Sequence, residues 1–141
     1  NNLVYQENGV DCNETGTANP IVATATTAQF DLADGDRFML VNRMLPDMTF
    51  EGSTADTPSA TMSLNPLENS GSGRYSPASE GGNSSNTVAR SATVPIEEFT
   101  GQVFTRVRGR QMSLTVESTD LGVTWKLGVP RMDMRPDGRR G

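Results

Sequence analysis

The sequence predicts an all-β fold, an antiparallel sandwich or barrel of about seven to nine short strands. Apolar and β-branched residues recur at every second position in several segments, whereas no stretch has the three-and-four spacing of a sizeable amphipathic helix. Turn residues separate these segments at short intervals. With 34% hydrophobic and 6% aromatic residues, the 141 residues are expected to form a single domain with a modest core of small side chains.

The N-terminal half is rich in short β-branched segments and has no helix cap. Its expected strands are 4–5 with 10 as a hairpin, then 21–30, 37–41, 48–50 and 60–64. Glycine, proline and aspartate mark the turns and strand ends, which are expected at Asn8-Gly9, Asp34-Gly35, Pro46-Asp47 and Gly52.

The C-terminal third has the most regular alternation. Its expected strands are 88–94, 102–108, 111–117 and 121–127, with one short helical turn at 96–99. Gly109 is predicted to sit at a β-bulge that changes which face the side chains occupy. With that bulge, Arg106 and Arg108 are expected to point outward while Met112 and Leu114 point into the core.

A long polar segment divides the two halves. Residues 69–86 consist mainly of Gly, Ser and Asn, and Tyr75 is the one large apolar side chain there. We expect a flexible loop, too long to be a simple turn, which is either a plain surface connection or a partner contact anchored by Arg74 and Tyr75.

Charge is distributed unevenly along the chain. Residues 1–104 hold 4 basic and 13 acidic side chains, a net charge of −9, whereas residues 105–141 hold 8 basic and 4 acidic ones, a net charge of +4. Eleven of the 12 basic residues are arginine, the side chain suited to bidentate pairing at interfaces. The interface candidates are therefore the C-terminal arginines, the last four of them on an expected arginine-rich tail over 131–141: Arg106, Arg108, Arg110, Arg131, Arg135, Arg139 and Arg140.

These arginines could pair with three kinds of partner. The first is a carboxylate within the same fold, and the second is an acidic surface on another copy of the chain. The third is nucleic acid, which is possible but not favoured, because no aromatic stacking platform is interleaved with the arginines and the whole chain has a net charge of −5.

The sequence lacks residues on which several classes of function usually depend. The chain has no His, so the common metal ligand and the general base of most hydrolases are missing, and its one Cys has no partner for an internal disulfide. The remaining route to catalysis is a carboxylate pair drawn from Glu97, Glu98, Glu117 and Asp120, which nothing distinguishes from solvated side chains. We expect no enzyme activity, cofactor or metal, and no membrane partner, because no apolar run approaches the 18–20 or so residues that cross a bilayer.

The most distinctive strings of the chain resemble a known family. The block FTGQVFTRVRGRQM over 99–112, VESTDLGVTW over 116–125 and LGVPRMDMRPDGRR over 127–140 look like the C-terminal end of virion structural proteins from tailed bacteriophages. LPDMTFEGST over 45–54 and ATMSL over 60–64 fit the same pattern. Together these strings cover about half of the chain.

The resemblance implies an assembly role without catalysis. In similar proteins a larger β-rich body, often like a β-propeller, precedes this segment, and the whole belongs to the short tail or the head-to-tail connection. We therefore expect the 141 residues to be the C-terminal part of a longer virion protein that contacts copies of itself and neighbouring virion proteins. The alternative is a capsid-decorating or host-surface-binding module, with 69–86 as its contact loop.

Overall fold

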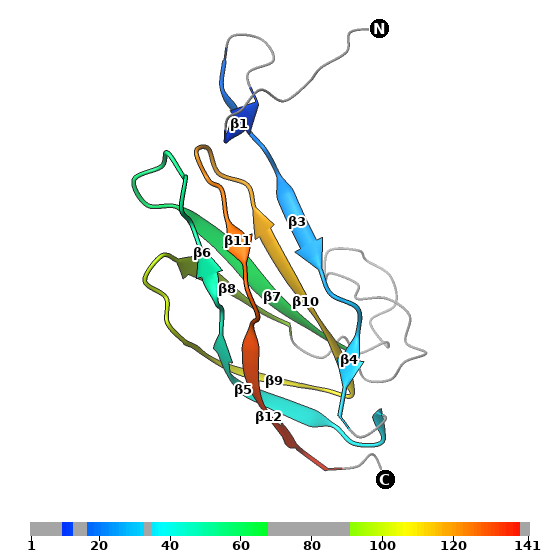
Figure 1. Cartoon of the computed structure of the whole chain (residues 1–141). Coiled ribbons are helices and arrows are strands. Elements are labelled where there is room, and N and C mark those ends of the chain that lie inside the picture. Colours follow the sequence, from blue (N-terminus) through cyan, green and yellow to red (C-terminus); the bar gives the residue numbers. More distant parts are fainter. Residues whose placement is uncertain (1–9, 13–16, 33–34, 68–90, 139–141) are drawn as a thin grey trace, which may run out of the picture.

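A computed structural model describes residues 10–12, 17–32, 35–67 and 91–138. This part of the chain is all-β, without a helix, and its twelve strands form antiparallel sheets in a sandwich-like arrangement (Figure 1). The sheets do not close into a barrel, so the sandwich alternative of the predicted fold class is confirmed. Seven strands have four or more residues and the other five have two, which brings the substantial strands within the expected number.

The larger sheet is built around two long strands that pair along most of their length. Its order is β3-β10-β7-β8, and β4 pairs with β10 beyond the end of β3. The strands are β3 (Ala23–Thr26), β4 (Phe30–Asp31), β7 (Ser59–Leu67), β8 (Ala92–Glu97) and β10 (Gln111–Ser118).

The smaller sheet faces the first and has the order β12-β5-β9, so β5 is its central strand. Its members are β5 (Met39–Leu45), β9 (Val103–Gly109) and β12 (Arg131–Pro136). Two short ladders complete the fold: β1 (Asp11–Cys12) with β2 (Asn19–Pro20), and β6 (Met48–Thr49) with β11 (Lys126–Leu127).

The core lies between the inward faces of the two sheets. Methionines supply much of its volume, since four of the seven in the sequence are fully buried: Met39, Met44, Met62 and Met112. A flexible unbranched thioether fills irregular space well, which suits a sandwich with few aromatic side chains. The rest of the cluster is mainly aliphatic, with Leu64, Leu114, Val107 and Val116 nearly inaccessible to solvent.

Gly109 occupies a corner rather than the predicted bulge. It ends β9 in the smaller sheet, and β10 begins two residues later in the larger sheet, so the chain passes from one layer to the other here. The expected change of face follows from this crossing: Arg106 and Arg108 are exposed, whereas Met112 and Leu114 are buried. Within the described residues, the strand registers shift elsewhere, between Val41 and Arg43 and between Asp133 and Met134.

The prediction of a strand over 121–127 is wrong for its first five residues, because only β11 at its end is a strand. Gly122 adopts a left-handed conformation with φ of 73°. Its N–H donates to Oδ1 of Asp11 at 2.7 Å, and its carbonyl accepts from the N–H groups of Thr54 and Ala55. Residues 121–125 therefore form a loop, held by these contacts, although their apolar and polar residues alternate as in a strand.

Other boundaries differ by a few residues. The strand expected over 21–30 is divided into β3 and β4, and the strand expected over 60–64 extends through Pro66 to Leu67. The turn at 96–99 lies at the end of β8, where the N–H of Thr100 donates to the carbonyl of Glu97. Gly35 and Gly52, at two of the predicted turns, have positive φ angles of 72° and 92°. The Asn8-Gly9 turn and the loop over 69–86 lie outside the described residues.

The packing of Trp125 provides a direct test of this arrangement. Its indole Nε1–H donates to Oγ of Ser118 at 2.9 Å, and Ser118 is only 3% exposed at the end of β10. We expect Ser118→Ala to lower the free energy of unfolding by about 1 kcal/mol, because the part-buried indole donor loses its acceptor. Chemical denaturation followed by tryptophan fluorescence measures this. Ser113→Ala on the same strand is the control, and an equal effect of both substitutions would contradict the role of this hydrogen bond.

Candidate interaction surface

The outward side of the smaller sheet carries most of its charged side chains. Along β9, the buried residues Val103 and Val107 alternate with exposed residues. Strands β9 and β12 flank β5 on its two sides. The pairing registers place Phe104 beside Arg43, and Arg43 beside Asp133. We call this surface the arginine face; it consists of Arg43, Phe104, Arg106, Arg108, Arg131, Asp133 and Arg135.

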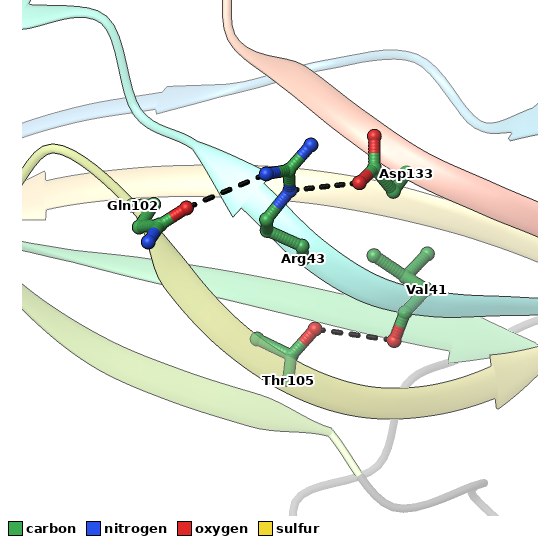
Figure 2. A network of polar contacts seen from close by, with 5 residues as sticks. All are labelled: Val41, Arg43, Gln102, Thr105 and Asp133. Atoms are coloured by element: carbon green, nitrogen blue, oxygen red, sulfur yellow. Dashed lines mark hydrogen bonds and ion pairs between the residues drawn. The ribbon is translucent and has the colours of Figure 1, made fainter.

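Arg43 projects from the central strand and links both edge strands (Figure 2). Its Nε donates to Oδ2 of Asp133 on β12 at 2.7 Å, and its Nη1 donates to Oε1 of Gln102, just before β9, at 3.4 Å. Below it, Oγ1 of Thr105 donates to the carbonyl of Val41 at 3.2 Å, where the register of β5 and β9 shifts. These contacts satisfy the polar groups around the bulge and fix the centre of the arginine face.

Arg108 is exposed but is held by contacts within the same chain. Its Nε donates to Oδ2 of Asp137 at 2.6 Å, and its Nη2 donates to the carbonyl oxygen of the same residue at 3.0 Å. Its guanidinium carbon lies 4.1 Å from the centre of the buried Phe38 ring, within cation–π distance. The expected intramolecular pairing therefore applies to Arg108, which anchors the segment after β12.

Three arginines of the arginine face have no such partner. Arg106, Arg131 and Arg135 are exposed, and within the described ranges none of them forms an ion pair. Phe104 lies among them with 74% of its surface exposed. This face has five arginines, and the carboxylates paired with them are those of Asp133 and Asp137. The surface therefore has a net positive charge in a chain whose net charge is −5.

The structure brings together four of the predicted site residues, Arg106, Arg108, Arg131 and Arg135. Arg110 lies at the corner between the sheets and shares the Phe38 ring with Arg108, since its guanidinium carbon is 5.6 Å from the centre of that ring. Residues 131–136 of the expected tail are strand β12, an edge of the smaller sheet. The other predicted site residues lie outside the described parts of the chain: Arg74, Tyr75, Arg139 and Arg140.

Sequence reasoning missed Arg43, Phe104, Asp133 and Asp137. Arg43 and Asp133 are 90 positions apart, so only the strand register identifies them as partners. Phe104 had a usable signal, because it lies two residues before Arg106 on an alternating strand and therefore tends to share its face. No aromatic platform was expected among the arginines; one exposed ring is present, without a second aromatic on the arginine face.

Other types of site find no support in the part of the chain that the structure describes. There, no three His, Cys, Asp or Glu side chains gather closely enough to hold a metal ion. The same residues include no helix long and apolar enough to cross a membrane. No protein-family model matches the sequence, and no curated protein matches it significantly.

Proposed function

We propose that this chain is a structural protein of a tailed-bacteriophage virion, which assembles the tail or the head-to-tail neck through contacts between subunits. The observation that carries the proposal is the arginine face, where three arginines that form no ion pair among the described residues accompany an exposed phenylalanine. The resemblance of the C-terminal strings to virion proteins supports the same assignment.

The composition of the arginine face is that of a protein interface. Arginine and aromatic residues are enriched in such interfaces and supply much of their binding energy. Arg43 and Arg108 are already fixed by aspartates, so the sheet presents the other arginines and Phe104 on a rigid surface. Because Arg43 and Arg108 are already ordered, binding has to immobilise only the other side chains of the face, which limits the entropy cost.

Nucleic acid fits this surface less well. Binding of single strands uses several aromatic rings on which successive bases stack, together with a groove of unpaired basic side chains. The arginine face has one exposed ring, Phe104, and carries the carboxylate of Asp133 on the edge strand β12. That carboxylate pairs with Arg43, which is therefore not an unpaired basic side chain for a phosphate.

Mass spectrometry of intact, purified particles with quantified copy number tests the proposal. We expect about six to twelve copies per particle, the number set by closed rings at a tail or connector. Hundreds of copies would instead indicate a capsid-decorating protein. Absence of the chain from purified particles would overturn the structural role.

A further inference from the structure

One end of the sandwich is acidic. Five carboxylates there are exposed and, within the described residues, form no side-chain ion pair or hydrogen bond. They lie in the loop between β6 and β7, at the turn between β8 and β9, and in the loop between β10 and β11. We call this group the acidic end; it consists of Glu51, Asp56, Glu97, Glu98 and Asp120.

Strand pairing and loop contacts place these three loops together. Ser59 at the start of β7 pairs with Glu97 at the end of β8, and Thr61 pairs with Glu117 near the end of β10. The carbonyl of Gly122 accepts two hydrogen bonds from the loop after β6. Figure 1 shows the β6–β7 and β10–β11 loops side by side at the upper end of the sandwich.

The acidic end also carries an exposed aromatic side chain. Phe99 follows Glu97 and Glu98 directly and is 92% exposed at the turn between β8 and β9. An exposed phenylalanine beside two carboxylates complements a surface of arginines, because the ring accepts guanidinium groups on its face while the carboxylates neutralise their charge.

We infer that the acidic end of one copy of the chain binds the arginine face of another copy. This inference rests on the proposed assembly function and specifies its contact. Charge complementarity is the argument: the ion pairs among the described residues use Asp133 and Asp137, so within this part of the chain the carboxylates of the acidic end and the three exposed arginines of the face have no ion-pair partner and can pair with a neighbour.

Two different surfaces of the same chain then meet at the contact. Such an interface joins subunits head to tail around a ring, or closes reciprocally between two copies when each end meets the other's face. Phe99 and Phe104 supply apolar contact area, while the ion pairs select the orientation. Repetition of the contact around a ring makes individually weak contacts collectively durable.

Two charge-reversed variants of the 141-residue chain test the inference. The face variant carries Arg106→Glu, Arg131→Glu and Arg135→Glu, and the end variant carries Glu51→Lys, Glu98→Lys and Asp120→Lys. All six side chains are exposed, so both variants are expected to keep the wild-type circular dichroism and thermal unfolding. The readout is sedimentation velocity over a concentration series at low and at physiological salt.

We expect the wild-type chain to self-associate and to dissociate as salt is raised. Each variant alone is expected to raise the dissociation constant by about a hundredfold, and an equimolar mixture of both to restore association. The mixture restores it because the acidic face of one variant meets the basic end of the other. Lys126→Glu, an exposed reversal on β11 outside both surfaces, serves as the control and is expected to leave association unchanged.

The end variant separates this contact from general charge repulsion. Its three reversals change the net charge from −5 to +1, so weaker overall repulsion would strengthen self-association, whereas the proposed contact predicts that association weakens. Strengthened association of the end variant would therefore overturn the inference.

The remaining outcomes are equally decisive. If neither variant alters association, this contact is overturned and the assembly function stands. The same conclusion follows if the wild-type chain stays monomeric at every concentration although particles contain it. A chain absent from particles removes the assembly function itself. Binding of a single-stranded oligonucleotide by the wild type but not by the face variant, without self-association, would assign the arginine face to nucleic acid instead.

Discussion

Replacing Gly109 by valine is expected to lower the free energy of unfolding by about 3 kcal/mol, the upper part of the range for overpacking a tight site. A Cβ atom at this position would lie 2.7 Å from Cβ of Pro66 and 3.2 Å from the carbonyl oxygens of Leu67 and Gln111. None of these atoms belongs to the far end of a flexible side chain. The clash can be relieved only by moving β7 or the start of β10.

Gly101→Val is the matched control for this substitution. Gly101 also flanks β9, but no atom lies within 4 Å of a Cβ built there, so the same change is expected to alter stability by less than about 0.5 kcal/mol. Urea unfolding of both variants gives the comparison. Equal stabilities of the two would show that the chain does not pass between the layers at this tight corner.

The strands with strict alternation could be predicted from the sequence alone. β9 and β10 match their expected ranges to within a residue at each end, because each has a buried face and an exposed face that the side-chain pattern records. The segment 121–125 has the same alternation but no strand. Its conformation depends on the contacts of Gly122 with Asp11 and with the loop after β6, which no local pattern encodes.

The arginine face could be predicted only in part. Alternation on β9 indicates that Arg106 and Arg108 share a face, and this is what the structure has. That β12 joins the same sheet depends on long-range pairing with β5, through a bulge that shifts the register between Asp133 and Met134. The acidic end depends even more on topology, because its three loops come from distant parts of the chain and meet only when the two sheets pack.

A second large effect is expected for Leu114→Ala in the centre of β10, which should lower the free energy of unfolding by about 3 kcal/mol. Leu114 is 2% exposed and pairs with Leu64 on β7. Its backbone is held on the other side by Thr27, whose Oγ1 accepts from the N–H of Leu114 and whose own N–H donates to the Leu114 carbonyl. Because β10 is fixed on both sides, the cavity left by the leucine cannot collapse. The free energy of unfolding is therefore expected to fall by the full amount.

Leu121→Ala provides the same chemical change at a residue that is 48% exposed, and we expect it to cost less than about 1 kcal/mol. The loss at Leu114 should be the same at low and high salt, because no charge is involved, whereas the contact at the arginine face should weaken with salt. Leu114 belongs to the larger sheet and the reversed arginines to the smaller one, so combining Leu114→Ala with the face variant should lower stability by no more than Leu114→Ala alone. A larger loss in the combined variant would mean that the arginine face also supports the core, and the surface would then have a structural role beyond binding a neighbour.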